Sequence, residues 1–156
     1  MNLHGGGDGF YTPIAGSLEE GFSARPVYYG MLLAERFAGS TFVNASLSAQ
    51  AGGQNVTGFA ALSGRNAGAP SWKLALFNKA TDPVNIQVAG LPHTGDKADV
   101  TLMHGLAIDA KEGVTFGGSS VDPDGSFSPK PQLAVTMQRG RTLLALPAYT
   151  AAYIEL

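Results

Sequence analysis

Apolar residues between positions 26 and 37 recur with the period of an α-helix. Two sets of apolar side chains lie three or four positions apart, so each set occupies one side of a helix. Pro26 suits the first helical turn, where its missing N–H leaves no hydrogen bond unmade, and Gly39 is a typical residue just beyond a helix end. Gly30 costs about 1 kcal/mol relative to alanine inside a helix, which indicates close packing against another element at that point. The pattern predicts one helix over residues 26–37.

Beyond Gly39 the apolar residues alternate with a period of two, which is typical of half-buried β-strands. The segments are short, and Gly, Pro, Asn or Asp separates them. The predicted strands cover residues 40–49, 54–64, 72–80, 84–91, 98–106, 132–139, 142–148 and 149–156. Seven or eight short strands with turns between them are typical of a sandwich. The predicted fold class is therefore all-β, an antiparallel β-sandwich of about seven to eight strands with one N-terminal helix.

The connections between these strands carry turn residues. Arg139, Gly140 and Arg141 predict a tight hairpin turn, and Pro147 predicts a strand end or edge. Residues 113–131 are rich in Gly, Pro, Asp and Ser and predict a long loop with a small hairpin at Asp124 and Gly125. The chain thus divides into a loop and helix over residues 1–39 and a β-sandwich over residues 40–156.

The composition limits the class of partner. Charged residues make up 14% of the 156 residues, against about 25% in an average soluble chain. The formal net charge of −2 gives no electrostatic reason to expect nucleic acid or an anionic membrane as partner. The low charge instead indicates that something else covers part of the surface of this chain. The chain has no cysteine, which excludes disulfides and thiolate metal sites.

Four segments resemble the C-terminal region of glycoside hydrolase family 79, which includes β-glucuronidases and heparanase-like enzymes. They read NLHGGGDGFYTPI (2–14), ARPVYYGMLLAERFAGSTFV (24–43), VTFGGSSVDPDGSFSP (114–129) and LLALPAYTAAYIEL (143–156). In that family a (β/α)8 barrel performs the chemistry and a C-terminal β-sandwich packs against its side. The resemblance implies that residues 2–4 end the eighth barrel strand, residues 5–25 form the following loop, and residues 26–38 form the eighth barrel helix.

The same resemblance implies a role for the N-terminal loop. Loops at the carboxyl ends of barrel strands build the active site, and glycines there let backbone N–H groups approach a ligand closely. Backbone donors and a tyrosine hydroxyl suit a sugar carboxylate. The residues implied as remnants of a uronate-binding rim are His4, Gly5, Gly6, Gly7 and Tyr11. Ordinary packing at a barrel mouth is the alternative for His4 and Tyr11.

We expect no catalytic residue in this chain and no enzyme activity from it alone. A retaining glycosidase needs two carboxylates about 5–5.5 Å apart, and in family 79 both come from earlier barrel strands. The chain does contain acidic residues, but their positions in a linker, on the helix, at loop edges and in turns favour solvated surface roles. They include Glu19, Glu20, Glu35, Glu112, Asp122, Asp124 and Glu155, and Asp8 in the N-terminal loop is a single carboxylate.

Metal and cofactor sites are not expected either. His4, His93 and His104 are far apart in the sequence, and a zinc site needs at least three converging ligands. The Gly-rich stretch lacks the Lys-Ser/Thr ending of a phosphate-binding loop, and Asp122 and Asp124 lack the further oxygen ligands of a calcium loop. We predict neither a metal nor a cofactor.

The function predicted is a non-catalytic accessory domain that braces the barrel of a family-79-like, β-glucuronidase-like hydrolase. The predicted partner is that barrel or a second copy of the chain, through the helix and an apolar sheet face. Two alternatives remain open: a carbohydrate-binding module for uronate-containing glycans, using Trp72 or Tyr11, and one part of a split glycosidase. No signal peptide is expected in residues 1–25, and the compartment stays open, although the resembled family is often secreted or periplasmic.

Overall fold

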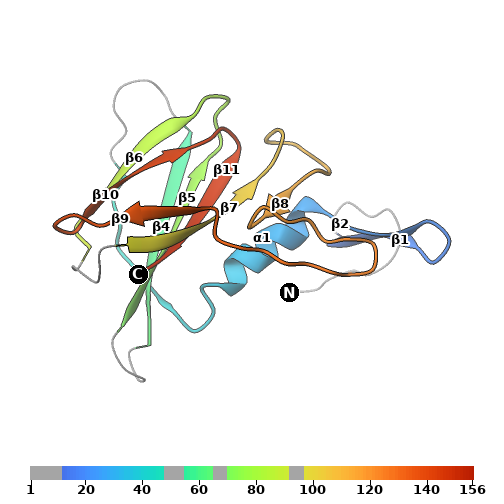
Figure 1. The fold of residues 1–156 in the computed structure, drawn as a ribbon, viewed down its shortest axis with the longest axis horizontal. Helices are drawn as coiled ribbons and strands as arrows, with labels where there is room; N and C mark the ends of the chain where they lie inside the picture. The colour runs from blue at the N-terminus through green and yellow to red at the C-terminus, as the bar shows by residue number, and fades with distance from the viewer. Residues whose placement is uncertain (1–11, 48–54, 65–69, 92–96) are drawn as a thin grey trace.

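The structure is a computed structural model that describes residues 12–47, 55–64, 70–91 and 97–156. These ranges contain one helix and eleven strands (Figure 1). Each of the eight segments predicted to be strands contains a strand, and all strand pairs are antiparallel. The prediction of an all-β antiparallel sandwich with one N-terminal helix is confirmed.

The strands form a large sheet, a small sheet and a separate hairpin. The large sheet has the order β3-β4-β5-β11-β7-β8, and β9 also pairs with β7. Its strands are β3 (Thr41–Val43), β4 (Val56–Ser63), β5 (Ser71–Asn78), β11 (Thr150–Glu155), β7 (Lys97–His104), β8 (Thr115–Phe116) and β9 (Leu133–Thr136). The small sheet pairs β6 (Val84–Ala89) with β10 (Arg141–Leu146), and the hairpin pairs β1 (Ile14–Ser17) with β2 (Gly21–Ala24).

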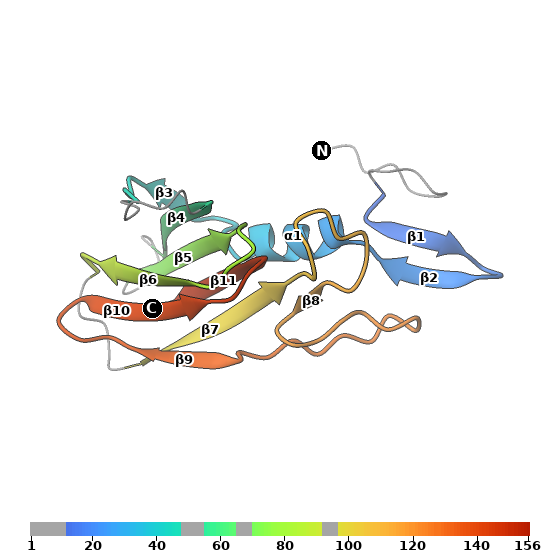
Figure 2. The ribbon, with the colours of Figure 1, turned by 90° about the horizontal axis from the view of Figure 1, so that it is seen from above.

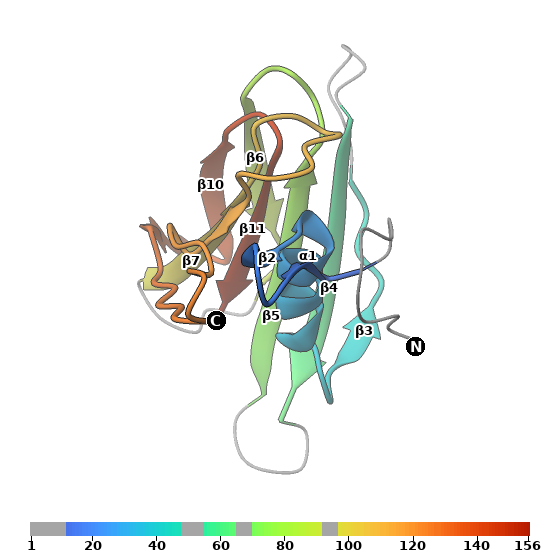
Figure 3. The same cartoon turned by 90° about the vertical axis from the view of Figure 1, so that its right-hand side faces the viewer.

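The first core lies between the two sheets. Leu74, Leu76 and Ile154 of the large sheet pack with Ile86 and Leu146 of the small sheet, and all five side chains are buried. Burial of aliphatic side chains between two sheets is the main source of stability in a sandwich. Figure 3 shows β6 and β10 together on one side of the molecule, with α1 (Pro26–Glu35), β4 and β3 on the other.

The second core lies on the opposite face of the large sheet, where α1 packs. Tyr29, Leu33 and Phe37 are spaced four residues apart, and they bury against Ala75 and Tyr153 of the sheet. Ala61 and Ala151 are also part of this core, so small residues on the sheet let the helix approach closely. The molecule therefore has three layers, with α1 outside the sandwich and the β1–β2 hairpin projecting beyond it (Figure 2).

Three short strands escaped the sequence pattern. Residues 5–25 were expected to be a loop, but residues 14–24 form the β1–β2 hairpin, in which Glu19 and Glu20 follow Leu18 at the tip. Strand β8 has only two residues. The turn expected at Asp124 and Gly125 is present, but no strand flanks it. β1, β2 and β8 have too little alternation of apolar and polar residues to produce a period-two signal.

The strand predicted over residues 40–49 is much shorter than expected. β3 ends at Val43, and residues 44–47 are exposed and lie outside any strand. Residues 48 and 49 lie outside the described part of the chain. The segment alternates small and polar residues, which offer little apolar area to hold a strand at the edge of the sheet.

The close packing predicted at Gly30 is wrong. A Cβ atom at Gly30 would have no heavy atom of the described residues within 4 Å. The helix itself begins at Pro26 as predicted, and its last residue, Glu35, precedes the expected end by two positions. Gly39 has a φ of +70°, as the residue that terminates a helix often does.

The β9–β10 turn matches the sequence prediction. Gln138 and Arg141 exchange backbone hydrogen bonds of 2.8 and 3.0 Å across Arg139 and Gly140. Both central residues have positive φ, +49° and +69°, which is the geometry of a type I′ hairpin turn. β10 then ends at Leu146, immediately before Pro147.

Asn78 joins the end of β5 to the turns at the end of the sandwich. Its side chain is almost fully buried. The amide nitrogen donates to the carbonyl oxygens of Asp82, Leu146 and Pro147 at 2.8, 3.2 and 2.9 Å, and the amide oxygen accepts from the Ala80 N–H at 3.1 Å. A single polar side chain thus links four backbone groups of the chain.

We expect Asn78→Ala to lower the free energy of unfolding by about 3 kcal/mol, because buried backbone groups would lose their partners. Urea denaturation measures this change. The exposed Asn85 on β6 provides the control, since Asn85→Ala should change the value by no more than about 0.5 kcal/mol. Equal losses in the two variants would contradict the role assigned to Asn78.

Two glycine substitutions should act in opposite directions. Gly30→Ala should raise the free energy of unfolding by about 1 kcal/mol, because a helical alanine replaces glycine and its Cβ meets open space. Gly140→Ala should lower it by roughly 2 kcal/mol, since φ is positive and the new Cβ would collide with the Leu91 carbonyl oxygen. Thermal or urea unfolding measures the change in stability of both variants. A loss of stability in Gly30→Ala would show that other atoms occupy the space that the new Cβ enters.

Candidate functional site

The predicted rim residues His4, Gly5, Gly6, Gly7 and Tyr11 lie outside the residues that the structure describes. Description begins at Thr12, which is buried. The hairpin that follows carries three exposed apolar side chains, Ile14, Leu18 and Phe22, of which Leu18 at the tip is 94% exposed. The segment after the predicted rim therefore presents apolar groups to its surroundings.

Helix α1 is apolar on both its sides. One side carries Tyr29 and Leu33 and packs on the large sheet, together with Phe37 just beyond the helix end. Val27 and Ala34 lie on the exposed part of the helix. Glu35 is the only charged residue among Pro26–Glu35. A helix with apolar residues all round is normally buried on all sides.

An apolar groove runs between α1 and the large sheet. It has a volume of about 420 Å³, and its lining is almost entirely apolar. Its lining residues are Gly30, Leu33, Ala34, Phe37, Ala38, Phe42, Phe59, Ala75, Phe77 and Met103. Gly30 lies along it, so the missing side chain leaves the groove open.

Four aromatic rings form a continuous row along this groove. Phe37 stacks on Phe42 with ring centroids 5.7 Å apart, Phe59 meets Phe42 at 6.4 Å, and Phe77 meets Phe59 at 6.0 Å. Phe42 is 61% exposed and Phe59 is 48% exposed. The row presents a partly exposed apolar surface with few hydrogen-bonding groups, and aromatic residues are enriched at protein interfaces.

Tyr29 connects α1 to the long loop over residues 113–131. Its hydroxyl oxygen accepts a hydrogen bond of 3.0 Å from the Val121 N–H, and its ring meets Phe127 edge-on at 6.3 Å. Tyr29 is buried. The helix is thus held both by the sheet below it and by this loop beside it.

The acidic residues that the structure describes mostly have structural partners or lie at exposed tips. Asp122 and Asp124 both accept hydrogen bonds from Ser126, at 3.0 Å from its hydroxyl and 2.8 Å from its N–H. Hydrogen bonding from Ser126, chiefly from its backbone N–H, lowers the pKa of Asp124 below its usual value. This geometry is an Asx-type turn.

Glu155 is part of a small cluster at the end of β11. Its carboxylate accepts a hydrogen bond of 2.7 Å from the Tyr153 hydroxyl and one of 3.1 Å from the Ser71 hydroxyl. Burial and the neighbouring Glu155 raise the pKa of Tyr153 above its ordinary value. The tyrosine therefore stays neutral and acts as a hydrogen-bond donor.

Trp72 and His104 have structural surroundings. Trp72 is partly buried and packs against the core between the sheets, so it does not stand out as a sugar-stacking platform. His104 ends β7, and its Nδ1 lies 2.8 Å from the Thr150 hydroxyl, which itself donates to the Ala148 carbonyl.

Among the described residues, no three acidic, histidine or cysteine side chains are placed to hold a metal ion. The helix in the described ranges is not long and apolar enough to cross a membrane.

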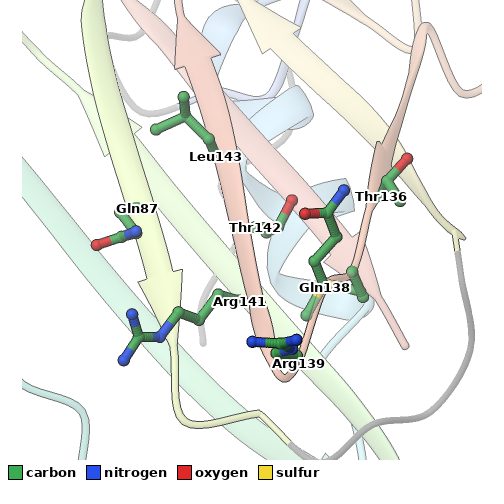
Figure 4. Close-up of a pocket in the computed structure, with 8 residues that line it drawn as sticks. Gln87, Thr136, Gln138, Arg139, Arg141, Thr142 and Leu143 are labelled. Atoms are coloured by element: carbon green, nitrogen blue, oxygen red, sulfur yellow. The ribbon is translucent and has the colours of Figure 1, made fainter.

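A second surface is lined by residues of β6, β9, β10 and the β9–β10 turn. It is an open concavity of about 1080 Å³. Figure 4 shows its polar side chains, which come from all three strands and from the β9–β10 turn. The exposed ones are Gln87, Thr136, Gln138, Arg139, Arg141 and Leu143.

This surface was not predicted from the sequence. Arg139, Gly140 and Arg141 were predicted only to form a turn, and no role was predicted for the two arginine side chains. The alternation of apolar and polar residues did indicate which side chains are exposed, because the outward positions of β6 and β10 alternate with the buried Ile86, Leu144 and Leu146. What the pattern did not show is that β6 and β10 are neighbours.

No family model matches this sequence, and a search of curated proteins finds no match. Solved structures do share the fold. A 4-O-α-L-rhamnosyl-β-D-glucuronidase from Fusarium oxysporum 12S is similar over 86% of this chain and 30% of its own, with a TM-score of 0.64 and 15% identity. A GH51 arabinofuranosidase from Xanthomonas axonopodis pv. citri is similar over 94% of this chain and 29% of its own, with a TM-score of 0.61 and 18% identity. The chain spans less than a third of each enzyme, and it has the fold of that part of these glycoside hydrolases.

Proposed function

We propose that this chain is the non-catalytic C-terminal β-sandwich domain of a family-79-like, β-glucuronidase-like glycoside hydrolase. Its role is to brace a catalytic (β/α)8 barrel, and α1 is the last helix of that barrel. The observation that carries the proposal is the apolar character of α1 on the side that its own sheet does not cover. Leaving such a surface in water is unfavourable, so a partner surface belongs there.

The exposed apolar residues support a partner on this side. Among the described residues, six of the eleven exposed large hydrophobic side chains lie on the hairpin, the helix and the two strands beside the helix. They are Ile14, Leu18, Phe22, Val27, Phe42 and Phe59. The apolar groove beside α1 adds an indentation into which side chains of the partner fit.

The size of the similar enzymes also supports this proposal. About 70% of the length of each lies outside the similarity to this chain, which leaves room for a catalytic unit. The family-79 assignment is finer than this fold similarity. It rests on the sequence resemblance of residues 2–14, 24–43, 114–129 and 143–156.

The proposed division of labour leaves the chemistry to the barrel. Retaining hydrolysis requires an acid/base and a nucleophile, both carboxyl groups, about 5–5.5 Å apart. In the described part of this chain, Asp122 and Asp124 hold a turn, and Glu155 is hydrogen-bonded to Tyr153 and Ser71. We therefore propose that this chain by itself does not hydrolyse glucuronides.

A charge on the outer side of α1 should disrupt association with the barrel. In the isolated chain, Val27→Glu should change the free energy of unfolding by less than about 0.5 kcal/mol, because Val27 is 41% exposed and an acidic residue is favourable in the first helical turn. In contact with the barrel it should weaken association roughly tenfold or more, because an unpaired charge would be buried. Ala34→Glu should weaken association in the same way, because Ala34 also lies on the exposed part of the helix.

The measurement uses the 156-residue chain and the barrel segment encoded upstream of it, with calorimetry for association and an aryl glucuronide for activity. Asn85→Glu is the matched control, since it adds the same charge on the opposite face. Equal binding by Val27→Glu and Asn85→Glu would count against the docking face. Glucuronide hydrolysis by the isolated chain, or a coding region with no barrel and no pair of glutamates upstream, would overturn the proposed function.

A further inference from the structure

The surface lined by β6, β10, the end of β9 and the β9–β10 turn carries two arginines within a chain of net negative charge. Arg139 and Arg141 lie at the β9–β10 turn, and no acidic residue occurs in β6, β9 or β10. The whole chain has a formal net charge of −2. We call this surface, made of Gln87, Thr136, Gln138, Arg139, Arg141 and Leu143, the arginine face (Figure 4).

The two arginines lie where their guanidinium groups are free to bind a ligand. Both side chains are exposed, and no ion pair or hydrogen bond is recorded for either guanidinium group among the described residues. Because β6 and β10 are paired in register, Gln87 lies opposite Leu143, and Arg141 lies opposite Ala89. Arg141 and Gln87 therefore extend from the same side of the small sheet.

Arg139 occupies an unfavourable backbone position. Its φ is +49°, and in the first central position of such a turn Asn, Asp or Gly is normally preferred. A non-glycine residue in this region carries a cost of order 1 kcal/mol. Arginine is not a favoured residue at this position of the turn, and it does not contribute to the core there. What arginine adds here, compared with asparagine, is its charged side chain.

The chemistry of the arginine face selects the ligand. A guanidinium group presents a planar fork of N–H donors that matches a carboxylate. Gln87, Gln138 and Thr136 add amide and hydroxyl groups that donate to and accept from hydroxyl groups. Leu143, which is 66% exposed, adds an apolar patch for the C–H face of a ring.

We propose that the arginine face binds a carboxylate-bearing polysaccharide, with Arg139 and Arg141 recognising its carboxylates. The choice of a polysaccharide over other carboxylate-bearing chains rests on the proposed function. The concavity is open and is lined mainly by exposed side chains. Pockets for small molecules enclose most of their ligand, whereas an open face lets a long chain pass across it.

This face is separate from the docking surface. α1 and the small sheet cover opposite faces of the large sheet, because their cores are formed by alternate residues such as Ala151 and Ala152. Binding of a polysaccharide on the arginine face therefore leaves α1 free for the barrel. The two activities can be tested independently.

The test measures binding of the 156-residue chain to polygalacturonate by calorimetry at about 0.1 M salt, where exposed charges more than about 10 Å apart are largely screened. We expect the double variant Arg139→Asn/Arg141→Gln to bind roughly tenfold more weakly than the unmodified chain. Asparagine suits the positive φ at position 139, so urea unfolding should show no loss of stability in this variant. Lys79→Gln/Lys111→Gln, which removes two exposed charges elsewhere, should bind as the unmodified chain does.

Two further ligands test the chemistry. Fully methyl-esterified polygalacturonate keeps the sugar backbone but loses the charge, and it should bind at least tenfold more weakly. Dextran sulfate, a sulfated neutral glucan, should also bind more weakly than polygalacturonate. The proposal fails if the unmodified chain does not bind polygalacturonate, if both double variants lose binding equally, or if dextran sulfate or the methyl ester binds as well as the free acid. None of these outcomes bears on docking through α1.

Discussion

The structure depends on β11, a central strand that is buried on both its faces. It pairs with β5 on one edge and with β7 on the other. Ala152 and Ile154 point into the core between the sheets, and Ala151 and Tyr153 point into the core beneath α1. A strand with apolar residues on both faces needs a layer on each side. The small sheet supplies one of these layers and α1 supplies the other.

This arrangement explains why the helix belongs with the sandwich. Tyr29, Leu33 and Phe37 fill the space above the alanines of β4, β5 and β11. The Tyr29 hydroxyl also holds the backbone of Val121, so the helix is fixed to the loop as well as to the sheet. A partner that packs on the outer side of α1 would therefore be joined rigidly to the sandwich through one helix.

The two outer surfaces differ in chemistry. The helix side presents aromatic and aliphatic groups, with a groove left open by Gly30. The β6–β10 side presents amides, a hydroxyl and two arginines. An apolar surface is stabilised by a lasting protein contact, whereas a polar surface is stable in water and is free for reversible binding. The proposed support of a barrel and the proposed binding of an acidic polysaccharide use these two surfaces separately.

The sequence by itself determined most of the secondary structure. Pro26 marked the start of the helix, alternation located eight strands, and the residues at 139 and 140 identified the β9–β10 turn. These signals are local, because helix starts, pleat alternation and tight turns depend on neighbouring residues. Short elements such as the β1–β2 hairpin gave too few residues for a period.

Only the tertiary structure decided which surfaces these elements form. Gly30 was predicted to pack closely against another element, but it borders an open groove. The strand expected over residues 40–49 is limited to Thr41–Val43 at the sheet edge. The arginine face exists because β6 and β10, separated by more than fifty residues, pair with each other. Strand pairing over such a distance is set by the burial of the whole core, and no local pattern contains that information.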